Sequence, residues 1–334
     1  MKREKKRACE VFHRASRFVV TSHQNIDGDG LGSALALASL LKKMGKEVRV
    51  VYDGRVPYFY LFLPGAEEVL SYEAFCSSFG SLDAFVVVDC SNPGRLGRVE
   101  ELLQKASLVV NIDHHPDNSK FGHVNFVDPS SPASALLVYE LAREMRIPLD
   151  ANIAVPILTG IVTDTGGFQF AELNQTMFTI VGELVASGAS LSTIMHHVFR
   201  YRRIEALKLL GRALEHLVFD PSYGCATTYL TQEDFAMCNA QEEDAEGIVD
   251  YGLYIPEAEV SIFFKEIAPE VYKVSLRSRQ GFDVLSVAHH FGGGGHRKAA
   301  GFKMVGPLSL VYETVTGYVK ALAQNMTCVG EKRC

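Results

Sequence analysis

The chain has 334 residues, of which 47% are hydrophobic and 22% charged, and its formal net charge is −6. This length exceeds the size at which a single hydrophobic core usually stops growing, so we expect two domains. The composition excludes a disordered or fibrous protein. The acidic balance argues against a protein that grips long duplex nucleic acid, because such binding requires a basic face.

The cysteines and the apolar runs bear on the cellular compartment. The seven cysteines are scattered and include no C-x-x-C pair, a pattern typical of free thiols in a reducing cytoplasm. The basic segment Lys2–Arg7 is not followed by an apolar run of the kind found in signal peptides, because Glu10, His13 and Arg14 interrupt it. No apolar stretch is long enough to cross a bilayer. We therefore expect a soluble cytoplasmic protein with no membrane partner.

The first 190 residues alternate short apolar runs with helical patterns, which predicts a doubly wound α/β domain built on a parallel sheet. The expected buried strands are Phe18–Thr21, Val48–Tyr52, Phe85–Val88 and Leu108–Ile112. The expected helices are Gly32–Met44, closed by Gly45, and Ala133–Met145. A further apolar segment, Ile153–Val162, leads into Thr163-Asp164-Thr165-Gly166.

The rest of the chain changes character. Residues 191–217 are helical and more charged, and we interpret them as a connection between domains. Residues 218–330 are predicted to form a smaller α/β domain with a mixed sheet, with strands at Glu259–Phe264 and Tyr272–Arg277 and a helix at Val284–Phe291.

Acidic and histidine residues follow strands or an apolar helix at four separate places in the first domain. They are His23 with Asp27 and Asp29, Asp89, Asp113-His114-His115, and Asp164. Because ligands collect at the carboxyl ends of parallel strands, we expect these side chains to converge. Clustered carboxylates repel one another unless a cation joins them, so the sequence predicts a site for two divalent metal ions, with Asp89 as the bridge.

The donor types bear on the identity of the metal. Mixed imidazole and carboxylate ligands favour Mn²⁺ over Mg²⁺ and leave Fe²⁺, Co²⁺ and Zn²⁺ open. Taken alone, Asp27 and Asp29 could shape a turn before a helix, and Asp113-His114-His115 could be a polar strand end. The joint occurrence of the four motifs favours the metal site.

A glycine run in the second domain is a candidate anion site. Gly292–Gly295 and His296 expose consecutive backbone N–H groups that can form a phosphate-binding concavity, although their order is not that of a P-loop. Arg277 and Arg279 could reach the same ligand. The alternative is an ordinary helix C-terminus rich in glycine. The doublets His196-His197 and His289-His290 are expected to be structural.

The order of these motifs resembles the DHH/DHHA1 phosphoesterase family over almost the whole chain. The residues that carry the resemblance are His23-x-x-Ile26-Asp27-x-Asp29-x-x-Gly32-Ser33, Asp89, Asp113-His114-His115, Thr163-Asp164-Thr165-Gly166 and Gly293-Gly294-Gly295-His296-x-x-Ala299-Ala300-Gly301. Within the family, the length and layout are similar to those of NrnA-type enzymes. Those enzymes degrade very short RNA oligonucleotides and dephosphorylate 3'-phosphoadenosine 5'-phosphate (pAp).

The resemblance implies a role for each matching residue. It implies that one Mn²⁺ is held by His23, Asp27 and Asp89, and the other by Asp29, Asp89, His114 and Asp164. It further implies that His115 faces the scissile phosphate, that Asp113 orients the histidine pair, and that Arg277, Ser278, Gly293, Gly294, Gly295 and His296 hold the terminal phosphate or nucleotide. Ile26 and Gly30 replace the Pro and Ala common in the family, which we expect to loosen the loop carrying Asp27 and Asp29.

We therefore expect hydrolysis of short oligoribonucleotides such as pApA, and of pAp, by a metal-bridging hydroxide. In this hypothesis the second domain selects short RNA oligonucleotides and small nucleotides by binding one end of the substrate. A cyclic or linear dinucleotide phosphodiesterase shares all the metal residues and is the closest alternative. A manganese pyrophosphatase and a non-catalytic nucleotide sensor are weaker alternatives. The sequence leaves open whether the protein is a homodimer.

Overall fold

The computed structural model describes residues 2–76, 82–169, 174–279 and 281–330. The chain divides into two compact units, Met1–Tyr201 and Arg202–Cys334. The division falls inside residues 191–217, the segment expected to connect two domains. Helix α7 (Leu191–Phe199) belongs to the first unit and helix α8 (Ile204–Glu215) to the second.

The first unit contains a sheet, helices and short 3-10 helices. Its strands are β1 (Arg17–Thr21), β2 (Glu47–Tyr52), β3 (Leu70–Ser71), β4 (Ala84–Val88), β5 (Leu108–Asp113) and β6 (Val124–Val127). Its other α-helices are α1 (Lys2–Arg14), α2 (Gly28–Lys43), α3 (Tyr72–Cys76), α4 (Ser134–Glu144), α5 (Ala151–Asp164) and α6 (Gln175–Ala186). The 3-10 helices are η1 (Tyr58–Tyr60), η2 (Ala66–Glu68), η3 (Pro93–Arg95) and η4 (Gly97–Gln104).

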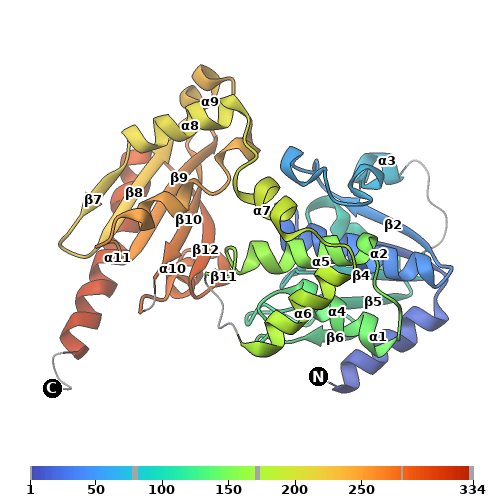
Figure 1. Cartoon of the computed structure of the whole chain (residues 1–334). Helices are drawn as coiled ribbons and strands as arrows, with labels where there is room; N and C mark the ends of the chain where they lie inside the picture. Colours follow the sequence, from blue (N-terminus) through green and yellow to red (C-terminus); the bar gives the residue numbers. More distant parts are fainter. Residues whose placement is uncertain (1, 77–81, 170–173, 280, 331–334) are drawn as a thin grey trace. The chain divides into compact units, whose positions relative to one another are not determined.

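The sheet of the first unit has the order β3-β2-β1-β4-β5-β6, and every neighbouring pair is parallel (Figure 1). The predicted doubly wound α/β fold is therefore confirmed. The chain winds outward in one direction through β2 and β3 and in the other through β4, β5 and β6. The reversal between β1 and β4 is the place where open α/β sheets bind their ligands, at the carboxyl ends of the strands.

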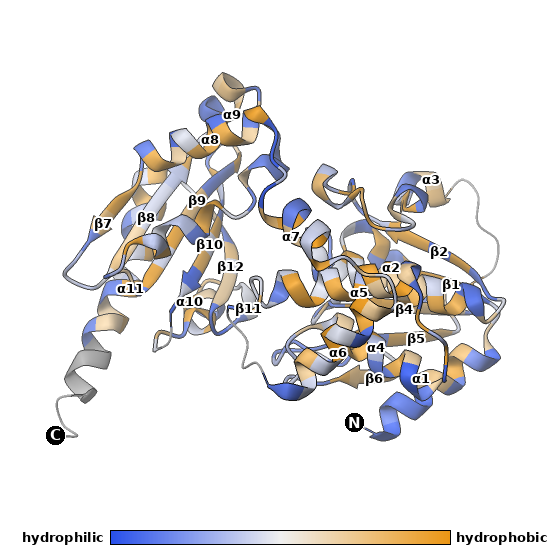
Figure 2. Cartoon of the chain, in the orientation of Figure 1, coloured by the Kyte–Doolittle hydropathy of each residue, from blue (hydrophilic) through white to orange (hydrophobic). Residues whose placement is uncertain are grey.

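Apolar side chains cover both faces of this sheet. One face packs with α1, α2, α4 and α5 in a core that includes Phe18, Val86 and Ile112. The other packs with α3 and η4 in a smaller core around Phe85. In Figure 2 the strands and α5 are mostly orange, as expected for elements enclosed within the unit.

Some boundaries differ from the sequence expectation. Helix α2 begins at Gly28, four residues before the expected Gly32, because the Asp27 side chain caps it by accepting from the N–H groups of Asp29 and Gly30. Helix α1 and strand β6 were not predicted. Helix α1 buries only Ala8, Cys9, Val11 and Phe12, and its many basic residues mask this narrow apolar stripe in the sequence.

The second unit is an α/β unit built on its own sheet. Its strands are β7 (Val218–Asp220), β8 (Cys225–Leu230), β9 (Val260–Ala268), β10 (Val271–Ser278), β11 (Gly294–His296) and β12 (Ala299–Val305). Its α-helices are α8, α9 (Gln232–Cys238), α10 (Val284–His290) and α11 (Leu308–Gly330), with 3-10 helices η5 (Glu242–Ala245) and η6 (Ile248–Tyr254).

This second sheet has the order β11-β12-β10-β9-β8-β7, with β8 and β9 parallel and all other neighbours antiparallel. The predicted mixed sheet is therefore confirmed. The main core of the unit joins Val274 and Phe302 of the sheet to α10 and α11, and a smaller core lies under α8, α9 and η6 around Phe263.

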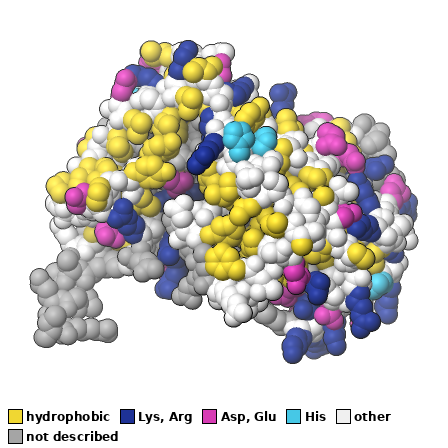
Figure 3. All heavy atoms as spheres, in the orientation of Figure 1, with side chains coloured by type: hydrophobic (Ala, Val, Ile, Leu, Met, Phe, Trp, Pro, Cys, Tyr) yellow, Lys and Arg dark blue, Asp and Glu magenta, His cyan; other side chains and the backbone are white. Residues whose placement is uncertain are grey.

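No single helix in the described part of the chain is both long and apolar enough to span a membrane, although α6 and α7 taken together have the length and composition for it, with a bend of 101° between them. Figure 3 shows basic and acidic side chains interspersed on the face that it displays.

Candidate metal centre

The predicted ligand residues converge at the carboxyl edge of the first sheet. His23 follows β1, Asp89 follows β4, and His114 follows β5. Asp27 and Asp29 lie at the start of α2, and Asp164 is the last residue of α5. These six residues are called the ligand cluster below. They come together because β1, β4 and β5 are consecutive neighbours in the sheet, so their ends share one edge.

One group of potential ligand atoms contains His23, Asp27 and Asp89. His23 Nε2 lies 3.5 Å from Asp89 Oδ2 and 3.7 Å from Asp27 Oδ2. The ligand atoms of all three residues lie within 4.8 Å of one another, close enough to hold one metal ion. Asp27 also caps α2, but it does so through Oδ1, which leaves Oδ2 facing His23. Its turn-shaping role and a ligand role are therefore compatible.

A second group contains Asp29, Asp89 and His114, again within 4.8 Å. His114 Nε2 lies 3.6 Å from Asp89 Oδ1, 3.8 Å from Asp29 Oδ2 and 3.0 Å from Asp164 Oδ2. Its Nδ1 lies 3.0 Å from the carbonyl oxygen of Ser131, which can only accept, so Nδ1 carries a proton and donates. That bond orients the ring with Nε2 toward the carboxylates, the arrangement usual for a metal-binding histidine.

The electrostatics of the ligand cluster favour a bound cation. Asp29 is fully buried, and burial together with the charges of Asp89 and Asp164 raises its pKa well above the ordinary value. Burial alone would also raise the pKa of Asp89, but the hydrogen bond from His23 and the charges of His115 and His114 outweigh it and hold that pKa far below the usual range. Divalent ions would relieve this repulsion between buried carboxylates.

Solvent reaches the ligand cluster at Asp27 and Asp164. The side chains of His23, Asp29, Asp89 and His114 are at most 5% exposed, whereas those of Asp27 and Asp164 are 45% and 21% exposed. An ion or a phosphate can therefore approach past Asp27 and Asp164, while the deeper residues form the floor of the site.

The backbone of Asp89 is itself unusual. Its φ is +53°, in the left-handed region that residues other than glycine, asparagine and aspartate rarely adopt. Its N–H donates to the Ile112 carbonyl at 2.9 Å, which ties the residue to the end of β5. This conformation turns the chain sharply at the end of β4, and such local strain is common at functional sites.

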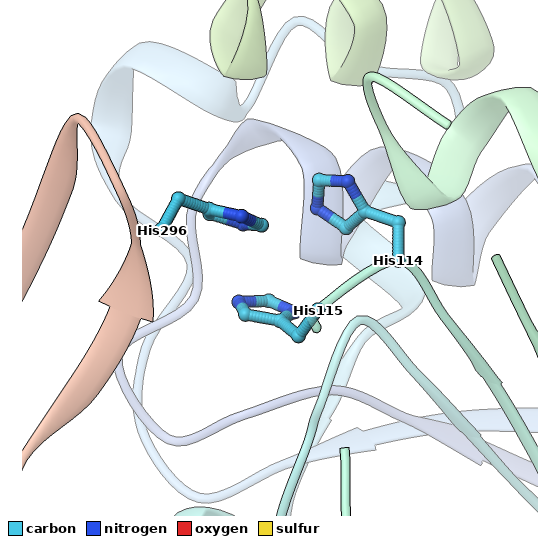
Figure 4. Close-up of side chains that lie close together, drawn as sticks. All are labelled: His114, His115 and His296. Carbon is cyan, nitrogen blue, oxygen red and sulfur yellow. The ribbon is translucent and has the colours of Figure 1, made fainter. Parts of the chain in front are cut away.

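His115 and Asp113 form a buried pair beside the ligand cluster. His115 Nδ1 donates to Asp113 Oδ1 at 2.7 Å, a hydrogen-bond distance that leaves no room for an ion between the two atoms. Asn118 donates from Nδ2 to the other carboxylate oxygen of Asp113 at 2.5 Å. Figure 4 labels the His114 and His115 side chains, and also His296 of β11. The His114 and His115 rings meet edge to face, with centroids 5.1 Å apart and planes 73° apart.

The loop that carries Asp27 and Asp29 is more tightly held than the sequence suggests. Ile26 is buried, and its N–H donates to the Tyr52 hydroxyl oxygen at 3.1 Å, a bond that proline could not make. A Cβ atom added at Gly30 would lie 2.4 Å from Ser22 Oγ, so the glycine permits close packing there. These contacts run against the expectation that Ile26 and Gly30 loosen this loop, which stays a prediction about its rigidity.

Two residues at the site were missed by the sequence reasoning. Ser134 donates from Oγ to Asp89 Oδ1 at 3.0 Å, and its N–H donates to Asp29 Oδ2 at 2.6 Å. Asn118 holds Asp113, as described above. A serine at the start of a predicted helix ordinarily indicates a local cap, so nothing in the sequence links Ser134 to carboxylates 45 and 105 positions away.

The predicted phosphate-binding residues of the second unit have mixed surroundings. The Arg277 side chain is 29% exposed, and its Nε lies 3.2 Å from Asp250 Oδ1. Ser278 is buried, and its hydroxyl donates to the Phe282 carbonyl at 2.7 Å, so it holds the turn after β10. Arg279 donates to the carbonyls of residues 253, 255 and 256, and this contact gives it a structural role.

The glycine run is a helix end followed by a strand. The N–H groups of Gly292 and Gly293 donate to carbonyls in the last turns of α10, and Gly294–His296 form β11 against β12. The expectation that the whole run presents its N–H groups to an anion is therefore wrong for Gly292 and Gly293, because the helix uses them. Contact between Gly294, Gly295 or His296 and a phosphate stays a prediction.

Comparison with known proteins agrees with this architecture. Residues 17–161 match the model of the DHH family, N-terminal domain, and residues 234–323 match that of the DHHA1 domain. The bifunctional oligoribonuclease and PAP phosphatase NrnA of Thermus thermophilus is 34% identical over 312 residues, covering 93% of this chain and 90% of that protein.

Solved structures give the same picture. An exopolyphosphatase-related protein from Bacteroides fragilis superposes with a TM-score of 0.87 at 27% identity, covering 97% of this chain and 98% of its own. RecJ from Thermus thermophilus, solved in complex with Mn²⁺, superposes with a TM-score of 0.58 at 18% identity, covering 96% of this chain and 55% of its own. The latter likeness concerns the fold alone.

Proposed function

Since this chain belongs to the NrnA family of DHH/DHHA1 hydrolases, we propose that it hydrolyses short oligoribonucleotides and pAp with the aid of two divalent metal ions. The observation that carries the proposal is the position of Asp89, whose two carboxylate oxygens face two different groups of ligand atoms. A carboxylate shared in this way is the usual bridge of a two-metal phosphoesterase site.

The donor set fits such a pair of ions. His23, Asp27 and Asp89 would hold one, and Asp29, Asp89, His114 and Asp164 the other. Bound there, the ions would supply activated water and neutralise charge on the phosphate. The mixed imidazole and carboxylate donors support Mn²⁺, and the Mn²⁺ complex of RecJ adds a precedent in the same fold.

His115 would serve the phosphate directly. Because Nδ1 donates to Asp113, we assign the other ring nitrogen, Nε2, to the contact with a phosphate oxygen. The buried Asp113 carboxylate fixes the orientation of the ring through this hydrogen bond. His115 is therefore proposed as the residue that binds and protonates the reacting phosphate, and Asp113 as its positioning partner.

The preference for short substrates is part of the proposal. We assign Arg277, with Gly294, Gly295 and His296, to the terminal phosphate or nucleotide. The net charge of −6 supports small nucleotides over long duplexes, since long nucleic acid requires a continuous basic face. The small size of pAp and dinucleotides makes a few cationic and backbone contacts sufficient.

The test is an activity panel with purified protein and Mn²⁺. The substrates are pApA, pAp, cyclic di-AMP, linear pGpG and pyrophosphate, and the variants are Asp89→Ala and the control Asp150→Ala. Asp150 forms a surface ion pair with Lys43 at 2.9 Å, so its loss should leave turnover unchanged. We expect hydrolysis of pApA and pAp by the wild type and the control, and at least a hundredfold loss in Asp89→Ala.

Other results would point elsewhere. Turnover of pyrophosphate alone would overturn the proposal, and preference for cyclic or linear dinucleotides over pAp would make the protein a dinucleotide phosphodiesterase. Nucleotide binding with equally negligible hydrolysis by the wild type and Asp89→Ala would make it a sensor.

A further inference from the structure

Helix α4 has no cap of its own. The residue at its N-cap position, Ala133, offers no side-chain acceptor. The first N–H groups of the helix instead donate to a distant carboxylate: Ser134 N lies 2.6 Å from Asp29 Oδ2, and Ala135 N lies 2.8 Å from Asp29 Oδ1. Asp29 thus takes the place of the missing cap, and the positive end of the helix dipole faces a residue of the ligand cluster.

The same helix end also reaches Asp89. Ser134 is fully buried, and its hydroxyl donates to Asp89 Oδ1 at 3.0 Å. That oxygen faces His114 at 3.6 Å, while Asp89 Oδ2 faces His23 at 3.5 Å. The hydroxyl therefore contacts one oxygen of the carboxylate that belongs to both ligand groups, and so fixes the rotation of that carboxylate about its last bond.

We propose that Ser134 is a positioning residue for the dinuclear site: its hydroxyl holds Asp89 in the rotation that lets its two oxygens serve two ions, while its N–H holds Asp29. This inference rests on the proposed function, because it requires metal ions at the ligand cluster. The backbone contact to Asp29 survives any side-chain change at position 134, so the hydroxyl can be tested by itself.

A carboxylate without this donor can rotate. Groups that hydrogen-bond a metal ligand from outside the coordination shell typically contribute about 10- to 100-fold in metal affinity or activity. We expect removal of the hydroxyl to weaken mainly the binding of the second ion, because either oxygen of Asp89 alone can still bind one ion. A serine that served only to fill space would instead change the stability of the metal-free protein and leave the metal affinity untouched.

The experiment compares Ser134→Ala, Ser134→Thr and the control Thr159→Val in the full-length protein. Thr159 is fully buried in α5, and its hydroxyl donates to the Val155 carbonyl of its own helix at 2.9 Å. Thr159→Val therefore removes a buried hydroxyl that does not contact the ligand cluster. Mn²⁺ binding is measured by calorimetric titration, the coupling between two bound ions by electron paramagnetic resonance, and metal-free stability by thermal melting.

We expect wild type and Thr159→Val to bind two Mn²⁺ with a spectrum of coupled ions. Ser134→Ala should bind the second Mn²⁺ about 10- to 100-fold more weakly and lose that spectrum, and Ser134→Thr, which keeps the hydroxyl, should recover it if it folds. Wild-type affinity and coupling in Ser134→Ala would overturn the inference while leaving hydrolysis of pApA by the wild type, and hence the proposed function, intact. Absence of Mn²⁺ binding by the wild type would overturn both.

Discussion

The pair formed by His115 and Asp113 can be tested by replacing Asp113 with asparagine, which has nearly the same shape. The carboxylate is fully buried and accepts from His115 on one oxygen and from Asn118 on the other. An amide has one acceptor and one donor, so either orientation of the new side chain places a donor against His115 or against Asn118, and the negative charge beside the imidazole is lost in both.

The expected cost follows from the type of bond. A hydrogen bond to a charged group contributes about 1.5–3 kcal/mol, and a factor of ten in rate corresponds to about 1.36 kcal/mol. If that energy stabilises His115 during the reaction, kcat for pAp should fall about 10- to 150-fold. Phosphate release under saturating Mn²⁺ measures kcat, and calorimetric titration checks that metal affinity is retained.

The matched control is Asp117→Asn, in the same loop but partly exposed. It removes a carboxylate charge two residues from His115 in the sequence and leaves the bond to Nδ1 in place, and we expect less than a threefold change. The reasoning is refuted if Asp113→Asn keeps kcat within threefold of the wild type, because His115 would then not need its buried carboxylate. It is also refuted if both variants lose the same factor, since net charge alone would then explain the effect.

Three further predictions concern stability. A Cβ atom at Gly32 would lie 2.3 Å from the Pro156 carbonyl oxygen, so Gly32→Ala should destabilise the protein by about 1–3 kcal/mol through overpacking of α2 against α5. Gly182→Ala, at a helix position with open space, should instead stabilise the protein by up to about 1 kcal/mol. Equal melting temperatures of the two variants and the wild type would contradict both expectations. Burial alone would raise the pKa of Asp234, but hydrogen bonds from Thr231 and Arg212 hold that pKa below its ordinary value. Because the folded-state pKa is the lower one, the contribution of the Asp234 carboxylate to stability is complete above about pH 4 and is lost as the pH falls through the folded-state pKa. Asp234→Asn should therefore melt below wild type at pH 7 and approach it in acid, and a difference in melting temperature that widened in acid would contradict this. Mn²⁺ at about 100 times its dissociation constant should stabilise the wild type by about 2.7 kcal/mol, seen as a higher melting temperature that EDTA reverses, and no shift would argue against a specific site.

Much of the site was predictable because its information is local. Each of Asp89, His114 and Asp164 follows an apolar run closely, and the parallel topology implied by those runs brings their ends to one edge. The strands at 85–88 and 108–112 could be predicted because each is a short, mainly apolar run, as expected for a strand buried on both faces. The sequence could therefore indicate which side chains converge before any distance was known.

The remaining features depend on information that is not local. Ser134 contacts carboxylates far away in the sequence, and its position at a helix start ordinarily indicates a cap. The glycine run is compatible with a helix end, a loop or an edge strand, because glycine restricts the backbone so little; only pairing with β12 decides in favour of a strand. The tightness of the Ile26 loop depends on the hydroxyl of Tyr52, from another strand.

The left-handed backbone of Asp89 constrains how this protein can vary. The residue must supply an anionic oxygen on each side and must also tolerate a positive φ, and among the twenty amino acids only aspartate does both readily. Glutamate has the charge but a longer chain and a poorer fit to that conformation, whereas glycine has the conformation and no side chain. A saturation library at this codon should therefore separate two pools: variants that fold and are inactive, led by asparagine and glycine, and variants that are lost from the soluble fraction.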